Sequence, residues 1–153
     1  MAIYLIQHGR SLSGESDPDP GLAPEGVADT ERIAGVAAGY GVCVGIIRHS
    51  AKARARETAV LFAAALDPER GIEETPGLKP MDDVPSFGKK LSYESNVMLV
   101  GHLPFMGRMA SHLVTGSADI PVFSFQNSGV VCLDREPGSP SWLIKWALMP
   151  HIG

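Results

Sequence analysis

The chain has 153 residues, a formal net charge of −4 at pH 7, 44% hydrophobic and 20% charged residues. This composition is typical of one globular domain, which we expect to span residues 1–153. Nucleic acids and anionic membranes bind basic surfaces, so the acidic balance argues against both as partners. We find neither a run of about 18 apolar residues that could span a membrane nor a secretory leader, and therefore expect a cytoplasmic protein.

Most of the chain alternates short apolar runs with helix-forming segments. Residues 2–7 are β-branched and aromatic and predict a buried strand, and the Ser-, Gly-, Asp- and Pro-rich residues 11–23 predict a loop. The later predictions, in chain order, are a helix from Pro24 to Gly39, a strand at 42–47, a helix at 51–66, a loop with a short strand at 67–81, a helix at 83–93, a strand at 96–101 and a helix at 104–114.

The C-terminal part has a different pattern. The apolar runs at 123–125, 129–134 and 142–149 predict three consecutive strands with no helix between them. Alternation places Trp142, Ile144, Trp146 and Leu148 on one face of the last strand. The two cysteines, Cys43 and Cys132, lie in apolar runs, and we expect both to be buried free thiols.

Strands that alternate with helices predict a parallel sheet covered on both faces. We therefore expect a three-layer α/β/α fold with a mainly parallel central sheet. The consecutive C-terminal strands add antiparallel edge strands to it.

Three of the five histidines follow predicted strands. Ligands of parallel α/β sheets bind beyond the carboxyl ends of the strands, so we expect these histidines to share one edge. Arginines accompany two of the three. The polar segments that follow the first, second and third strands are QHGRS at 7–11, RHS at 48–50 and GHLP at 101–104.

Histidines beside a guanidinium, without paired carboxylates, indicate an oxyanion ligand such as phosphate. Arginine matches phosphate with a planar fork, while glycine and a helix N-terminus offer backbone N–H groups. A neutral imidazole can attack phosphorus and form a phosphohistidine. A second, protonated histidine can stabilise the transferring group. This chemistry requires no cofactor and no metal.

Four blocks of the sequence resemble the histidine phosphatase superfamily, also called phosphoglycerate mutase-like, and within it the short SixA-type phosphohistidine phosphatases. The family has Arg-His-Gly where residues 7–9 read QHG, and Leu-Thr-x-x-Gly where residues 22–26 read LAPEG. It has Ser-x-x-x-Arg-Ala-x-Gln-Thr-Ala where residues 50–59 read SAKARARETA, and Gly/Ser-His-x-Pro where residues 101–104 read GHLP. The blocks occur in the family's order and spacing.

The resemblance implies a phosphoglycerate mutase-like fold and roles for individual residues. It implies that His8 is the nucleophile and that Arg54 and His102 bind phosphate oxygens. His102 also balances charge in the transition state, and the amide of Leu103 contributes an N–H group. Gln7 stands where the family has a phosphate-binding arginine.

The exchange of that arginine for Gln7 removes a charge. A neutral hydrogen bond contributes about 0.5–1.5 kcal/mol and a charge-assisted one about 1.5–3 kcal/mol. A loss of about 1–2 kcal/mol slows a reaction roughly 5- to 30-fold. Arg10 is a candidate substitute, with a solvated loop arginine as the alternative. His49 is a candidate phosphate ligand or an orienting partner of His8, with a structural role as the alternative.

The segment between the helix at 51–66 and the strand at 96–101 is too short for a large cap, so we expect an open pocket. Asp82 and Asp83 are the candidate general acids, but they are equally placed to cap the helix that follows. Lys52 and Arg56 are interpreted as the exposed face of their helix. An open pocket without a clear acid favours phosphohistidine, because a protonated imidazole leaves easily.

The sequence therefore favours a phosphatase that hydrolyses phosphohistidine on a signalling protein through a covalent intermediate at His8. One alternative is a phosphatase of small phosphate esters on the same fold. A second is a weakly active module that binds phosphate or a phosphoprotein, since Gln7 lacks the expected charge. A metal site built from His8, His49 and His102 is the remaining alternative.

Overall fold

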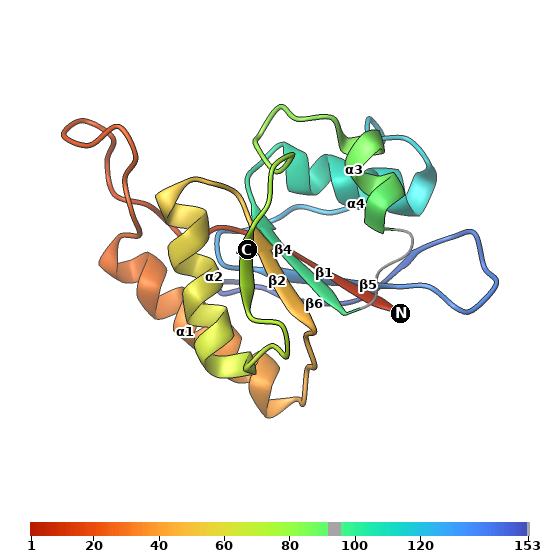
Figure 1. Ribbon diagram of the computed structural model, residues 1–153, viewed down its shortest axis with the longest axis horizontal. Coiled ribbons are helices and arrows are strands. Elements are labelled where there is room, and N and C mark those ends of the chain that lie inside the picture. The colour runs from red at the N-terminus through yellow and green to blue at the C-terminus, as the bar shows by residue number, and fades with distance from the viewer. Residues whose placement is uncertain (92–95, 153) are drawn as a thin grey trace.

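The computed structural model describes residues 1–91 and 96–152. Figure 1 shows helices on both sides of one sheet. The strands are β1 (Ala2–Gln7), β2 (Ile46–His49), β3 (Ile72–Glu74), β4 (Val97–Gly101), β5 (Val130–Asp134) and β6 (Leu143–Leu148). The helices are α1 (Pro24–Gly39), α2 (Ala53–Leu66), α3 (Val84–Leu91) and α4 (Phe105–Thr115).

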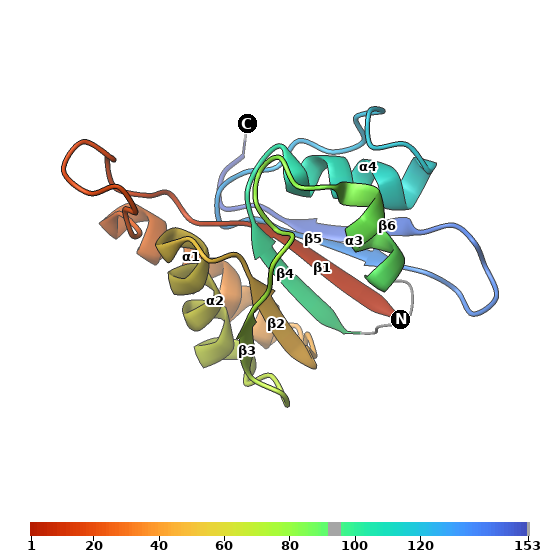
Figure 2. The same cartoon turned by 45° about the horizontal axis from the view of Figure 1, so that its top comes forward.

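The sheet has six strands in the order β3-β2-β4-β1-β5-β6 (Figure 2). Strands β3, β2, β4 and β1 are parallel to one another, whereas β5 pairs antiparallel with both β1 and β6. Parallel strands β1, β4 and β2 therefore end at the same edge. Their register places Gln7 beside Gly101 and His49 beside Val100.

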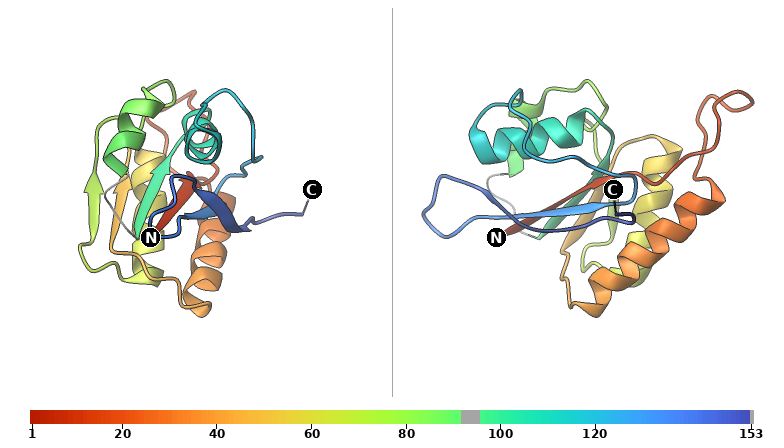
Figure 3. Two further views of the ribbon diagram at one scale, coloured as in Figure 1. Left: turned by 90° about the vertical axis from the view of Figure 1, so that its right-hand side faces the viewer. Right: turned by 180° about the vertical axis from the view of Figure 1, so that it is seen from behind.

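The two faces of the sheet are covered by different helix pairs, with α1 and α2 on one side and α3 and α4 on the other (Figure 3). Successive residues of β1 divide between the faces, as the pleat of a strand requires. Ile3 and Leu5 pack in the core with α3 and α4, and Tyr4 and Ile6 pack in the core with α1 and α2. The predicted three-layer α/β/α fold is confirmed.

Most predicted elements exist, several of them with shifted ends, but one predicted strand is absent. Strand β2 begins at Ile46 rather than at residue 42, so Arg48 and His49 lie within the strand. Residues 123–125 form no strand. Both edges of β5 are already paired, with β1 and β6, so this segment cannot pair with the strand that follows it. Its Phe123 and Phe125 pack instead on the core beside α3 and α4. Of the helix predicted at 83–93, residues 92 and 93 lie outside the described residues.

The last strand does not keep its alternation. Leu133 pairs with Ile144 while the preceding Cys132 pairs with Trp146, so β6 carries one extra residue in a bulge. An extra residue reverses the faces that follow it. Trp142 and Ile144 therefore pack with α3 and α4, and Trp146 packs on the opposite face. The prediction of one shared face is wrong.

The cysteine prediction holds for one residue. Both thiols are free, but Cys132 is buried in β5 and Cys43 is exposed. Cys43 is exposed because it precedes β2 in the connection from α1. No helix among residues 1–91 and 96–152 has both the length and the apolarity to cross a membrane.

The start of α1 is held against the chain that follows β1. Pro24 opens the helix and Glu25 lies in its first turn, both favourable at a helix N-terminus. Ala23 N donates to the Arg10 carbonyl oxygen at 2.9 Å. A Cβ added to Gly26 would overlap the Arg10 carbonyl oxygen, so only glycine fits beside this backbone.

We predict that Gly26→Ala lowers the free energy of unfolding by roughly 1–3 kcal/mol, because the backbone of Arg10 must move. Gly35→Ala is the matched control in the same helix, since a Cβ there meets no atom within 4 Å. It should stabilise the protein by roughly 0.5–1 kcal/mol. Urea denaturation measures both, and equal effects of the two substitutions would contradict the close approach.

Candidate active site

Two histidines meet where β1 and β4 end. His8 directly follows β1 and His102 directly follows β4. Their imidazole centroids lie 5.0 Å apart. Arg54 reaches them from the first turn of α2, which follows the neighbouring strand β2. The predicted convergence of His8, Arg54 and His102 is thus present in the structure.

The hydrogen bonds of His8 define its tautomer. His8 Nδ1 lies 2.7 Å from the Gly9 carbonyl oxygen, which can only accept, so Nδ1 carries the proton. The neutral ring then has its lone pair on Nε2, which accepts from Arg54 Nε at 3.3 Å. Burial lowers the pKa of His8; the bond to Gly9 opposes this shift and the charge of Arg54 adds to it. His8 is therefore held neutral, with Nε2 toward Arg54.

His102 is almost fully buried, with 2% of its surface exposed. Its Nε2 shares a hydrogen bond of 2.6 Å with Ser50 Oγ. Burial lowers the pKa of His102 to about 4, and the charges of His8, Arg54 and Lys52 contribute. Its Nδ1 is buried and has no hydrogen-bond partner among residues 1–91 and 96–152. An anion beside this ring would favour its protonated form.

The backbone around Gly9 is fixed by α2. Gly9 N donates to Thr58 Oγ1 at 2.9 Å, and Thr58 Oγ1 donates to the Arg54 carbonyl oxygen at 2.7 Å. Thr58 therefore connects Gly9, the residue after His8, to the helix that carries Arg54. The sequence comparison placed Thr58 in a family block but assigned it no role.

The loop before β5 holds the same backbone from the other side. Asn127 Nδ2 donates to the His8 carbonyl oxygen at 2.8 Å, and Ser128 N donates to the Gln7 carbonyl oxygen at 2.9 Å. Ser128 Oγ also hydrogen-bonds Thr30 Oγ1 of α1 at 2.7 Å. Sequence reasoning missed these three residues. The Asn-Ser-Gly sequence at 127–129 indicates a turn, but it does not indicate which residues the turn contacts.

The two residues considered for the missing charge differ in position. Gln7 is half-buried, and its Oε1 is buried without a hydrogen-bond partner in the described part of the chain. Arg10 is exposed. Its backbone is bound to Ala23 and lies against Gly26. Arg10 stays a prediction as a phosphate ligand.

The structure shows no contact between His49 and His8 among the described residues, and His49 stays a prediction as a site residue. His49 is 3% exposed in β2, and its Nδ1 lies 2.8 Å from the Ser50 carbonyl oxygen. Both ring nitrogens of His8 are engaged by Gly9 and Arg54 instead. His49 thus holds the turn into the 50–52 segment, and this contact favours the structural alternative.

Leu103 follows His102 at the start of the turn into α4, and 40% of its surface is exposed. The carbonyl oxygen of His102 accepts from Met106 N at 2.9 Å, which fixes this turn. The amide of Leu103 donates to no acceptor among residues 1–91 and 96–152. It is therefore available to a phosphate oxygen, as the family resemblance implies.

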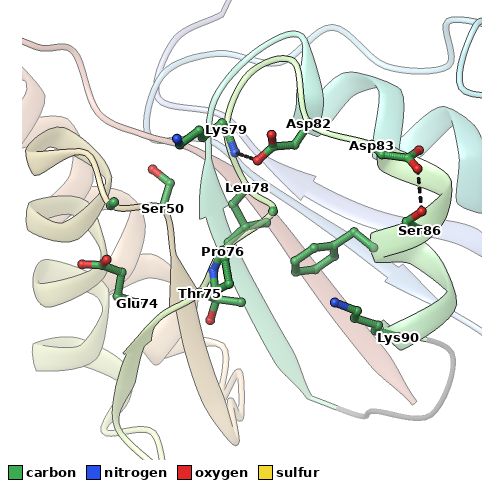
Figure 4. A pocket seen from close by; sticks show the side chains of 13 residues that line it. Ser50, Glu74, Thr75, Pro76, Leu78, Lys79, Asp82, Asp83, Ser86 and Lys90 are labelled. Atoms are coloured by element: carbon green, nitrogen blue, oxygen red, sulfur yellow. Dashed lines mark hydrogen bonds between the residues drawn. The ribbon is translucent and has the colours of Figure 1, made fainter.

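A pocket of about 500 Å³ opens beside Ser50, between the segment after β3 and the start of α3 (Figure 4). Asp82 and Asp83 line it, but both carboxylates are engaged. Asp82 Oδ2 accepts from Lys79 N at 2.9 Å, and Asp83 Oδ2 accepts from Ser86 Oγ at the start of α3. Each carboxylate thus accepts a hydrogen bond within the turn that leads into α3, and the two residues stay predictions as general acids.

The metal alternative lacks a geometric basis. Among residues 1–91 and 96–152, no three His, Cys, Asp or Glu side chains lie close enough together to hold a metal ion. His49 turns its Nδ1 to the Ser50 backbone rather than toward His8 and His102.

The fold is that of the phosphoglycerate mutase-like phosphatases. No protein-family model and no curated protein matches the chain. Solved structures match over nearly its whole length, and their names confirm the resemblance to the histidine phosphatase superfamily that the four sequence blocks indicated.

Three of these structures show how similar the chain is to them in fold and in sequence. The protein histidine phosphatase SixA, solved with tungstate, has a TM-score of 0.85 at 22% identity and covers 98% of this chain and 97% of its own. A protein assigned as SixA from Agrobacterium tumefaciens has a TM-score of 0.78 at 25% identity, with 97% of each chain covered. One from Escherichia coli K-12 assigned as an α-ribazole-5′-P phosphatase has a TM-score of 0.76 at 16% identity, covering 100% of this chain and 99% of its own.

We predict that the two site histidines make the protein less stable in acid. Their pKa values lie below the ordinary 6.5 in the folded state, to about 4 for His102. The unfolded chain therefore takes up protons first, so stability present above pH 6.5 is lost as the pH falls toward 4. The slope is at most about 1.4 kcal/mol per pH unit for each histidine.

Urea denaturation at pH 7, 6, 5 and 4.5 measures this loss. His102→Gln, which keeps a polar side chain but cannot titrate, should show a shallower slope than the wild type. An identical slope in the two proteins would show that His102 titrates normally in the folded state.

Proposed function

We propose that the protein is a phosphatase that hydrolyses phosphohistidine on a cytoplasmic signalling protein through a covalent intermediate at His8. The observation that carries the proposal is the tautomer of His8. Its Nδ1–H is bound to Gly9, which leaves the Nε2 lone pair beside Arg54 and His102. An imidazole held in this form is a nucleophile without further activation.

In the first step the Arg54 guanidinium, the Leu103 amide and the side chain of Gln7 bind phosphate oxygens. Arg54 releases Nε2 of His8 as it turns to the anion. Nε2 then attacks phosphorus, and the P–N bond to the substrate imidazole breaks. The leaving imidazole departs with its proton, so no strong enzymic acid is needed. His102, protonated beside the anion, stabilises the charge on the transferring group.

In the second step water attacks the phosphorus of the His8 phosphoenzyme. The bond between phosphorus and Nε2 breaks, Nε2 regains its lone pair, and inorganic phosphate leaves with the oxygen of the water. His8 returns to its Nδ1–H tautomer because the Gly9 carbonyl oxygen keeps that proton in place. The low pKa of His8 favours this return, since a phosphate-free ring stays neutral.

The substrate class follows from what surrounds the site. Phosphate esters leave as alkoxides and require a proton donor, whereas the two predicted acids, Asp82 and Asp83, each accept a hydrogen bond within their own turn. The pocket beside Ser50 is open rather than covered by an inserted cap. An open site suits a phosphoryl group displayed on a protein surface. Three of the structural neighbours carry the name SixA, which also supports phosphohistidine.

The alternative is a phosphatase of small phosphate esters, which other neighbours support. One is assigned to an α-ribazole phosphate and another is a phosphoserine phosphatase from Entamoeba histolytica. We predict that the protein turns over a synthetic phosphohistidine peptide at least tenfold faster, by kcat/KM, than p-nitrophenyl phosphate. The reverse order would favour the ester alternative.

We predict that acid-labile, base-stable phosphate becomes attached to the protein when turnover is stopped rapidly at high pH. The label should be absent in His8→Ala and present in the control Arg56→Ala, whose side chain is exposed on α2. Intact-protein mass spectrometry measures it. Turnover should survive EDTA. A label that persists in His8→Ala would contradict the proposed nucleophile.

A further inference from the structure

The phosphate site has one guanidinium where the family resemblance implies two. Arg54 is the cation beside His8. Gln7 is neutral, and Arg10 is exposed, with no contact to the two site histidines among the described residues. A phosphoryl group in transfer carries two to three negative charges, so a single cation leaves the site short of positive charge.

Lys52 stands at the edge of this site. It is the half-buried residue that directly precedes α2, two positions before Arg54. Its amide donates to Ser50 Oγ at 3.4 Å, and the same oxygen hydrogen-bonds His102 Nε2 at 2.6 Å. The backbone of Lys52 is therefore connected through one hydroxyl group to a phosphate-binding histidine. It does not lie on the exposed face of the helix, as Arg56 does.

The positive charge of Lys52 also acts electrostatically on the site. Burial is the main cause of the lowered pKa of His102, and the charges of His8, Arg54 and Lys52 add to it, that of Lys52 the least. Charges act on a buried imidazole in this way only from nearby. The ammonium thus contributes to the field in which a phosphate would sit.

The ammonium group of Lys52 is also available to bind an anion. Lys52 forms no ion pair with any carboxylate among residues 1–91 and 96–152. Asp19 lies at the start of α2, but its carboxylate accepts from Ala53 N at 3.1 and 3.3 Å. Lysine carries its charge on a flexible four-carbon stem, so it can turn toward an anion without moving the backbone.

We propose that Lys52 is the second cation of the phosphate site and supplies from the start of α2 the charge that Gln7 lacks at the end of β1. The inference rests on the proposed function in that the ligand is a phosphoryl group. Lys52 then contacts a phosphate oxygen from the side of the site where Ser50 and His102 lie. The second positive charge of the site then comes from the start of α2 instead of the end of β1.

The first test is binding of inorganic phosphate, measured by isothermal titration calorimetry at pH 7.5. Lys52→Gln should weaken binding roughly 5- to 30-fold, the range for losing a partly exposed charge-assisted contact. Lys52→Arg should stay within about threefold of the wild type. Arg56→Gln is the matched control on the same helix and should bind phosphate as the wild type does. Thermal unfolding of each variant verifies that it is folded.

The second test couples the two positions. Gln7→Arg should restore phosphate affinity in the Lys52→Gln background and add much less in the wild type, because the two cations serve the same anion. Equal gains in both backgrounds, or a Lys52→Gln variant that binds phosphate like Arg56→Gln, would overturn the role of Lys52.

Failure of the inference and failure of the proposed function give different results. A wild type that binds phosphate and forms the His8 phosphoenzyme, with Lys52→Gln unchanged in affinity, overturns only the role of Lys52. A wild type that does not bind inorganic phosphate overturns both. Phosphate affinity that depends on Lys52 in a protein without turnover supports the role of Lys52 and contradicts the proposed phosphatase.

Discussion

The hydrogen bond from His8 Nδ1 to the Gly9 carbonyl oxygen is the contact on which the site depends, and the fold is arranged to hold Gly9 in place. Thr58 of α2 binds its amide. A Cβ at Gly9 would come within 2.8 Å of Thr30 Oγ1 and 3.1 Å of Ser128 Oγ, so the space is filled from α1 and from the loop before β5. Elements from three parts of the chain thus position the Gly9 carbonyl group. Through its hydrogen bond, this group fixes the tautomer and orientation of the His8 ring.

The parts of this arrangement that sequence reasoning predicted are local ones. Apolar runs that stop at His8 and His102 are legible in a single sequence, and parallel pairing then brings their ends together. The missed contacts join residues far apart in the chain, such as Thr58 with Gly9 and Asn127 with His8. Pairing also decided the wrong predictions. Both edges of β5 are occupied, so residues 123–125 cannot pair with it, and the bulge in β6 reverses the face of Trp146. No local pattern carries that information.

The charges of the site differ from the family pattern at the end of β1. The oxyanion needs positive charge from its surroundings, but the element that supplies it is not specified. Gln7 removes a cation from the end of β1, while Lys52 brings one to the start of α2, beside Ser50 and His102. Burial keeps both histidines neutral until an anion arrives. Binding of phosphate and protonation of His102 are then coupled, since each favours the other.

The central claim is that the ends of β1 and β4 and the start of α2 form one phosphoryl-transfer site around Nε2 of His8. A crystal structure with orthovanadate tests it most directly, because vanadium takes the five-coordinate geometry of a transferring phosphoryl group. The account predicts a bond between vanadium and His8 Nε2, with Arg54 and His102 on the equatorial oxygens. Vanadate bound away from His8, or bound there without a bond to Nε2 while His8 keeps its contact with Arg54, would contradict it.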